Sequence, residues 1–421
     1  MVHNAIRILE EFIVFKGLKI NSWRQFENVE LSFHPRLTIL TGANGAGKTT
    51  ILNLLNNHFG WNSIFLSTPK KDKQGLLKFV SGIFKLFESN TSKYGNNIVI
   101  GNLHYSNNVS ADLTVPDEVG TSYNISVMNQ QSINGLYIPS HRPIYSYRQV
   151  SNIPTQPRTR DDIYNSHRSI LYNSYFSTSH EKTNYIIKEN LIALAMFGYG
   201  NQVVTPNPTA RQTFEDFQQI LRVILPPKLG FQNISIEMPE VNLVTKSGEF
   251  SLDAVSGGVA SLIDLAWQIF MYPNNNQPFV VTLDEPENHL HPEMQKMLLP
   301  NLIKAFPMAQ FIVATHNPFI ISSSPDSNVY ILDYNENNRV ISTYLDLVNK
   351  AGSSNDILRE VLGVSVTLPY WVEDKINSIV ERYSNNELNS EAISNLRQEM
   401  KEIGMDKLLP ETLGRIVDGR K

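Results

Sequence analysis

The stretch from Thr38 to Thr50, TILTGANGAGKTT, limits what this chain can fold into more than any other part of it. An apolar run leads into a loop of the pattern GxxxxGKT, and a helical pattern, ILNLL, follows. The glycines Gly42, Gly45 and Gly47 let the backbone turn tightly, so that successive N–H groups can face one polyphosphate. The order of strand, loop and helix therefore predicts a phosphate-binding loop in an α/β fold.

The polar residues of this loop predict a nucleotide with magnesium. Lys48 adds a positive charge for the outer phosphates, and the Thr49 hydroxyl can bind the metal ion that accompanies them. We expect ATP and Mg²⁺ as the ligands. The loop residues expected to contact the nucleotide are Gly42, Asn44, Gly45, Ala46, Gly47, Lys48, Thr49 and Thr50.

A second motif, PFVVTLDEPENHLHP, supplies the acidic residues that such a site needs. The apolar run from Phe279 to Leu283 is typical of a strand that is buried on both faces, and it ends in Asp284 and Glu285. Asp284 can hold magnesium opposite Thr49. Glu285 is turned the other way and can polarise the water that attacks the γ-phosphate.

Two more stretches complete the predicted site. An apolar strand ends in His316, and ligands bind at the carboxyl ends of strands in open α/β sheets. We expect His316 to contact the γ-phosphate or the attacking water. A turn of Ser256, Gly257 and Gly258 opens a helix, and its N–H groups offer a second place for an anion. The predicted catalytic residues are Lys48, Ser256, Glu285 and His316.

Composition excludes several classes of protein. The 421 residues suffice for two or three domains, and 41% of them are hydrophobic. Lys and Arg number 36 against 40 Asp and Glu, so no overall basic field attracts nucleic acid. The absence of cysteine excludes disulfides and thiolate metal sites, and it fits the cytoplasm, where we expect the protein. The apolar run from Leu191 is too short to span a bilayer, so we expect no membrane contact.

The middle of the chain departs from a minimal phosphate-loop domain. We predict an insertion of mixed strands and helices over residues 61–230, with helical spacing from Lys70 to Phe87. Within it, residues 141–172 hold five arginines and two aspartates among tyrosines and prolines. This segment is predicted to be a flexible loop that can follow a nucleic-acid backbone, order on a protein partner or simply remain solvated.

Taken together, the motifs resemble those of the ABC-type ATPases of the RecF, SMC and OLD (overcoming lysogenisation defect) group. The matching stretches are LKINSWRQFENVELSF, TGANGAGKTT, SGG, TLDEPENHLHP, QFIVATHNP and SSNDILREVLGV. More narrowly, the chain looks like the stand-alone OLD-like ATPases of bacteria, several of which serve in anti-phage defence. Val259 departs from the Gln or Glu of many relatives, and Gln130 and Gln131 are candidates for a glutamine loop.

The resemblance implies a two-lobed α/β fold of the ABC and SMC-head type, with a mixed sheet flanked by helices. Residues 1–60 and 231–350 are expected to form this ATPase core, and residues 351–421 a helical C-terminal region. The resemblance also implies a head-to-tail homodimer. In it, Ser256–Gly258 of one subunit closes over the ATP held by Lys48 of the other.

Two functions fit this resemblance. In the first, ATP closes the dimer and thereby controls a separately encoded toxin or nuclease in anti-phage defence. In the second, a RecF-like ATPase clamps duplex DNA during repair or recombination, with residues 141–172 as its basic patch. An ATPase subunit of a membrane transporter is disfavoured by the long insertion and by NHLHP after the acidic pair.

Relatives in the OLD group that cut DNA carry a further metal-binding nuclease domain. The carboxylates that follow His316 in this sequence show no cluster of metal-ligand type. We therefore expect an ATPase without a nuclease of its own.

Overall fold

The chain, seen in a computed structural model, forms two compact units, residues 1–357 and residues 358–421. The structure describes residues 14–71, 74–82, 93–94, 96–117, 119–141, 145–176, 183–275, 277–346, 352, 354–362, 370–384 and 389–418. No helix within these ranges is long and apolar enough to cross a membrane. The first unit contains the phosphate loop and the motifs around Ser256, Asp284 and His316.

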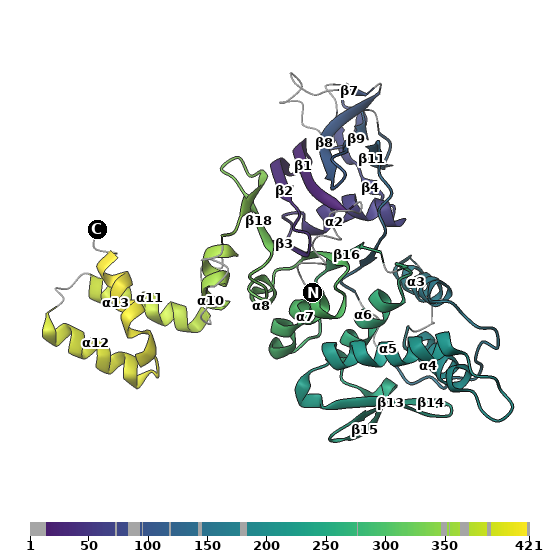
Figure 1. Ribbon diagram of the computed structural model, residues 1–421. Coiled ribbons are helices and arrows are strands. Elements are labelled where there is room, and N and C mark those ends of the chain that lie inside the picture. Colours follow the sequence, from purple (N-terminus) through teal and green to yellow (C-terminus); the bar gives the residue numbers. More distant parts are fainter. Residues whose placement is uncertain are drawn as a thin grey trace. The chain divides into compact units, whose positions relative to one another are not determined.

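A twelve-stranded sheet forms the centre of the first unit (Figure 1). Its strand order is β11–β9–β8–β1–β2–β19–β18–β3–β17–β16–β12, and β7 pairs with β8. The strands are β1 Phe15–Trp23, β2 Phe26–Ser32, β3 Leu37–Gly42, β7 Lys93–Tyr94, β8 Asn97–Tyr105, β9 Ser110–Pro116, β11 Ser126–Met128, β12 Gly135–Ile138, β16 Phe279–Asp284, β17 Ala309–Ala314, β18 Asn328–Tyr334 and β19 Val340–Tyr344. The sheet is mixed. Strands β12, β16, β17, β3 and β18 run parallel, whereas β1, β2, β8 and β9 are antiparallel.

The three strands that carry the motifs lie side by side in the parallel half. Strands β3, β17 and β16 are buried at every residue, as expected for strands covered on both faces. In the register of these strands, Leu40 pairs with Ala314 and Ala314 pairs with Asp284. Because the strands are parallel and in step, the residues that follow each of them emerge at one edge of the sheet.

Helices and three small sheets surround this sheet. The helices of the first unit are α2 Lys48–Asn56, α3 Arg160–Phe176, α4 Thr183–Tyr199, α5 Pro208–Ile224, α6 Gly257–Met271, α7 Pro292–Ala305, α8 Pro318–Ile321 and α10 Ser354–Asp356. The small sheets pair β4 Phe65–Leu66 with β10 Ser122–Tyr123, β5 Thr68–Lys71 with β6 Leu77–Val80, and β13 Phe231–Glu237 with β14 Glu240–Thr245 and β15 Gly248–Ser251. Helices α3 to α6 pack on one another, and α4 and α5 contact β14 and β13.

The mixed sheet with flanking helices confirms the predicted fold class, but the prediction of an insertion over residues 61–230 needs correction. Strands β8, β9, β11 and β12 arise from that range and belong to the main sheet, because β8 pairs with β1 and β12 with β16. The helical spacing predicted from Lys70 is also wrong, since β5 and β6 form a hairpin there. Residues 72–73 and 83–87 of that prediction lie outside the described residues.

The described part of the second unit is helical. Helices α11 Tyr370–Ser384, α12 Ser390–Glu402 and α13 Leu409–Asp418 bury a small core of their own. That core consists of Val372, Ile376, Ile379, Leu396, Met400, Met405 and Ile416.

Candidate functional site

The phosphate loop joins β3 to α2 and requires glycine at two of its positions. Gly42 has φ +131, and a Cβ there would lie 2.1 Å from the backbone oxygen of Leu332 in β18. Gly47 has φ +95, and its Cβ would lie 2.4 Å from the ring of Phe26. Any side chain at these positions would therefore collide with the fold or strain the backbone. The loop is a cradle of backbone whose shape only glycine permits.

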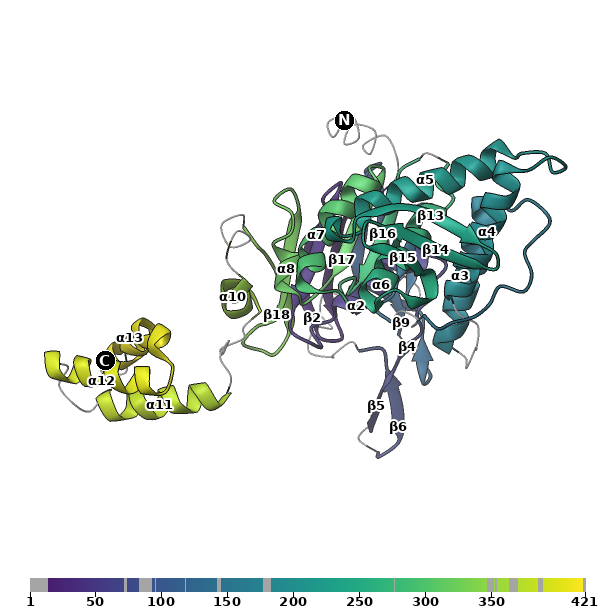
Figure 2. The same ribbon diagram turned by 90° about the horizontal axis from the view of Figure 1, so that it is seen from below.

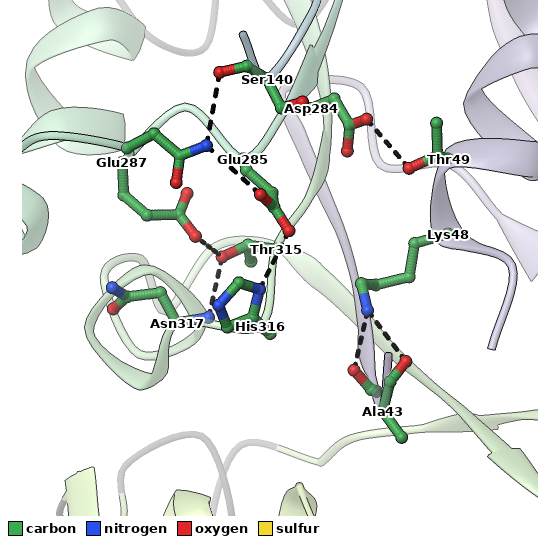
Figure 3. A network of polar contacts seen from close by, with 12 residues as sticks. Ala43, Lys48, Thr49, Ser140, Asp284, Glu285, Glu287, Thr315, His316 and Asn317 are labelled. Carbon is green, nitrogen blue, oxygen red and sulfur yellow. Dashed lines mark hydrogen bonds and ion pairs between the residues drawn. The ribbon is translucent and has the colours of Figure 1, made fainter. Parts of the chain in front are cut away.

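Lys48 begins α2 and is almost fully buried at the foot of this loop. Its Nζ donates hydrogen bonds to the backbone oxygens of Gly42 at 2.8 Å and Ala43 at 3.1 Å (Figure 3). Burial lowers the pKa of Lys48, and the nearby carboxylates of Glu285 and Asp284 partly offset the effect. Among the described residues, the hydrogen-bond acceptors of the ammonium are thus these two neutral backbone oxygens, which phosphate oxygens can replace.

The predicted magnesium ligands lie next to each other. The Thr49 hydroxyl donates to Oδ2 of Asp284 over 2.9 Å, although the two residues are far apart in the sequence. Burial raises the pKa of Asp284 from 3.8 to about 6, and the hydrogen bond from Thr49 only partly opposes this. A hydroxyl and a carboxylate are the oxygen donors that Mg²⁺ prefers, and a divalent cation would relieve the buried charge. These residues therefore fit the metal.

Glu285 lies one residue beyond Asp284 and faces the next strand end. Its backbone has φ 44, a left-handed conformation, and its N–H still donates to Ala314 of β17 over 2.8 Å. The carboxylate lies 3.1 Å from Nδ1 of His316 and also accepts a hydrogen bond from Asn288 over 3.3 Å (Figure 3). With roughly a third of its side chain exposed, Glu285 can reach a water molecule at the loop. The structure thus brings Lys48, Thr49, Asp284, Glu285 and His316 to one edge of the sheet.

The structure also shows residues that the sequence analysis missed. Glu287 is buried and accepts a hydrogen bond from the Thr315 hydroxyl, which in turn accepts one from the backbone N–H of Asn317 over 2.9 Å. Burial raises the pKa of Glu287. This contact fixes the turn that carries His316. The sequence held one signal for it, because Glu287 is a third acid within DEPEN and Thr315 directly precedes His316.

The turn Ser256–Gly258 is not part of this cluster. Ser256 caps α6, and its hydroxyl accepts a hydrogen bond from Val259 N–H over 3.5 Å. Ser256 and Gly257 are exposed, and the hydrogen bonds of Ser256 in the described chain stay within its own helix start. Gln131, one of the two candidates for a glutamine loop, bonds to Asn107 and Asn129 in the antiparallel half.

Part of the segment predicted to be a flexible loop, residues 141–172, is helical, whereas residues 145–159 form no helix or strand. Residues 160–172 lie within α3, and residues 142–144 lie outside the described part of the chain. Arg158 forms an ion pair with Glu189 at 2.9 Å. Arg160 donates to the backbone oxygen of Phe270 and lies over its ring. Arg158 thus ties the start of α3 to α4, and Arg160 ties α3 to α6.

Within the described ranges, no group of three or more His, Cys, Asp or Glu side chains is arranged to hold a metal ion. The pair of Thr49 and Asp284 is therefore the metal position that the predicted chemistry identifies in this part of the chain.

Comparison with known proteins agrees with this geometry. Residues 37–322 match the family described as "AAA domain, putative AbiEii toxin, Type IV TA system". "Retron Ec83 probable ATPase" of Escherichia coli is 25% identical over 49% of this chain, which spans only 36% of that relative. "Septu protein PtuA" of Bacillus thuringiensis is 21% identical over 86% of this chain and 87% of its own length.

One solved structure with a similar course of the chain is the Smc head domain of Pyrococcus furiosus, bound to the C-terminal domain of ScpA. It is 14% identical over 83% of this chain and 100% of its own, with a TM-score of 0.43. At that score, the likeness adds nothing to what the strand order and the site already show.

Proposed function

The chain belongs to this AAA-domain family, and from that membership we propose that it is an ATP-hydrolysing switch of an anti-phage defence system. In this proposal, it binds MgATP, closes as a head-to-tail dimer and controls a separately encoded effector. It is an ATPase of the RecF, SMC and OLD group, and relatives named after retrons and Septu support the role in defence.

One observation carries the proposal. Two polar pairs, Thr49 with Asp284 and Glu285 with His316, meet at the carboxyl ends of three adjacent parallel strands, next to the phosphate loop. A magnesium position, a water-polarising carboxylate and a phosphate cradle are the parts that phosphoryl transfer to water requires. A nucleotide-binding protein without hydrolysis would need the loop but not the second pair.

The reaction follows from where these groups point. The N–H groups of the loop and the Lys48 ammonium hold the β- and γ-phosphates, and Lys48 exchanges its two carbonyl partners for phosphate oxygens. Magnesium, when bound by Thr49 and Asp284, supplies positive charge against the phosphate oxygens. Glu285 accepts a proton from the attacking water, and His316 orients this carboxylate through its 3.1 Å contact. Glu287 and Thr315 keep His316 in place.

The exposed turn Ser256–Gly258 supports the dimer in the proposal. Its N–H groups lie at the start of α6, where the helix dipole favours an anion. No hydrogen bond in the described part of the chain joins this turn to the phosphate loop of its own subunit. We infer that it covers the γ-phosphate of a second subunit, so that each site consists of Lys48 from one chain and Ser256 from the other.

We further propose that any toxin or nuclease activity of the system lies in a separate protein. The Septu relative matches most of its own length to this chain, so the ATPase and the C-terminal helices together account for most of that protein. On this proposal, the purified chain alone leaves DNA intact, with or without ATP.

A mixing experiment tests the proposed site. Lys48→Ala and Ser256→Arg should each lower ATP turnover by at least about 100-fold, because one removes the phosphate cation and the other blocks the covering turn. An equimolar mixture should recover about a quarter of wild-type turnover, since half of the dimers are mixed and each has one intact site.

The matched control is a mixture of Lys48→Ala with Glu285→Gln. These two residues belong to the same site of the same chain, so no mixed dimer contains an intact site and turnover should stay low. Recovery in both mixtures, or in neither, would contradict the shared site.

A further inference from the structure

A cavity of about 330 Å³ lies in the helical layer of the first unit. Helices α3, α4 and α5 stand together at one side of the main sheet (Figure 2), and the cavity lies between residues 154–160, α4 and the start of α5. Small-molecule sites usually have volumes of about 300 to 1,000 Å³. None of its lining residues, all of which the structure describes, belongs to the candidate nucleotide site. The cavity is therefore a separate place for a ligand.

The wall of the cavity is mostly apolar. Its apolar residues include Pro154, Pro157, Ile163, Ala193, Leu194 and Phe197. Burial of apolar surface is favourable in water, so this wall suits an apolar or aromatic body.

Arg158 gives the cavity an unused pair of hydrogen-bond donors. Nη1 of Arg158 donates to Glu189 at 2.9 Å and to Asn190 at 3.4 Å, whereas its Nε and Nη2 have no acceptor in the described chain. Roughly a third of the side chain is exposed. Nε and Nη2 lie on one side of the guanidinium, where an acidic group can accept two parallel hydrogen bonds.

Other polar groups of the wall are also donors without an acceptor. Arg160 donates to the backbone oxygen of Phe270, but its Nε is buried and has no hydrogen-bond partner among the described residues. Oδ1 of Asn207 already accepts from the backbone N–H groups of Thr209 and Ala210, each at 3.1 Å, so its amide nitrogen remains. Unused donors favour a ligand that carries acceptor oxygens.

The charges around the cavity favour an anion. Arg158 and Arg160 are the charged residues among those that line it, and the neighbouring carboxylates of Glu189 and Asp216 do not line it. Burial lowers the pKa of Arg160, and Asp216 only partly offsets this effect. An anion in the cavity would therefore stabilise the charged form of Arg160.

We propose that this cavity binds a small organic anion, whose apolar or aromatic body fills it and whose acidic head pairs with Arg158. A polyphosphate would need more cationic groups than two arginines. A sugar would need more polar partners than the apolar wall provides.

Arg160 connects the cavity to α6. It donates to the backbone oxygens of Phe270 and Tyr272 at the end of that helix, and Ser256 caps its start. If the proposed ATPase function holds, the anion binds at one end of the helix whose other end covers ATP. We then expect the anion to change ATP turnover, whereas its binding requires no nucleotide.

Fluorescence titration of the full chain with anilinonaphthalene sulfonate, an aromatic anion, tests the cavity without nucleotide. Phenylnaphthylamine has the same aromatic body without the sulfonate. Wild type should bind the anion at least about tenfold more tightly than the amine. Arg158→Met should weaken binding of the anion at least about tenfold and leave binding of the amine within about twofold.

The matched control is Arg211→Met. Arg211 also forms an ion pair, with Glu215 at 2.8 Å, but does not line the cavity. Both probes should bind this variant within about twofold of wild type. Ala210→Trp places an indole in the cavity and should weaken both probes at least about tenfold, and Thr213→Trp serves the same purpose if Ala210→Trp does not fold.

Equal losses of anion binding in Arg158→Met and Arg211→Met would overturn the proposal. So would equal affinity of wild type for the two probes, no binding of either probe, or wild-type affinity in a folded tryptophan variant. Circular dichroism and thermal unfolding check that each variant is folded. Because the titrations contain no nucleotide, a failed ATPase proposal would leave their results unchanged.

Discussion

Two buried lysines show how differently the nucleotide site and the helical layer use charge. Lys188 in α4 is completely buried and bonds to Asp253 and Glu240, each at 2.6 Å, and to the backbone oxygen of Arg148. Burial opposes its charge, but these two carboxylates outweigh that effect and raise its pKa. Lys48 has only backbone oxygens in contact, and burial lowers its pKa.

The different partners of Lys188 and Lys48 suit different roles, one in stability and the other in ligand binding. In the helical layer Lys188 already has two charged partners and a bond to the backbone of Arg148, so it helps to hold residues 145–176 in place. At the nucleotide site the charges are placed for a ligand and cost stability until it arrives. Buried charge therefore does not identify a site by itself.

Substitution of Lys188 or Lys48 by methionine tests this comparison, and the expected change in stability is the largest of those considered. Lys188→Met leaves the buried carboxylate of Asp253 and the partly buried one of Glu240 without their cation, and should lower the free energy of unfolding by about 3 to 5 kcal/mol. Lys48→Met removes a cation whose charge the site disfavours, so it should change that free energy by less than about 1 kcal/mol while abolishing ATP binding. Urea denaturation and titration with a fluorescent ATP analogue measure the two quantities. Similar stability losses in both variants would contradict the proposed difference between Lys188 and Lys48.

Substitution of Asp284 should raise the free energy of unfolding, whereas substitution of Lys188 should lower it. Its folded pKa, about 6, lies above its ordinary value of 3.8, so its contribution to stability is complete below about pH 4 and is lost as the pH rises through 6. Asp284→Asn should then stabilise the magnesium-free protein by about 2 to 3 kcal/mol at pH 8 and hardly at all at pH 4. Denaturation curves at both pH values, without metal, provide the comparison. An unchanged or lower stability at pH 8 would contradict the account.

The smallest expected effect concerns the segment that the sequence suggested was a flexible loop. Arg158 and Glu189 form a partly exposed ion pair, so Arg158→Met should cost about 1 kcal/mol of stability and leave ATP turnover within about twofold of wild type. Thermal unfolding and a phosphate-release assay measure both. Unchanged stability would instead support the alternative, that the segment is a loop that orders on a partner.

The candidate nucleotide site could be predicted from the sequence because each of its parts is local. Gly42 to Thr49 specify the loop, and Asp284, Glu285 and His316 directly follow apolar runs that form buried strands. Parallel strands then bring these ends together without further information. The contact of Glu287 with Thr315 was not predicted, because it depends on side-chain directions in two separate turns.

Contacts between distant segments could not be predicted from the sequence. No local sequence pattern predicts that β12 pairs with β16, or that Arg160 donates a hydrogen bond to the backbone oxygen of Phe270. The β5–β6 hairpin illustrates a second limit. Apolar spacing between Leu76 and Val80 fits a helix as well as a strand, and the left-handed Gly75, at φ +81, decides for a hairpin. Spacing alone could not decide this, because short apolar runs are ambiguous.

The most direct test of the central claim, that Glu285 activates water at the site formed by Lys48 and Asp284, is a single-turnover measurement on Glu285→Gln. The amide keeps the shape of the side chain but cannot accept the proton. The account predicts ATP binding with wild-type affinity and cleavage that is slower by at least about 100-fold. Cleavage at close to the wild-type rate by fully bound Glu285→Gln would contradict it.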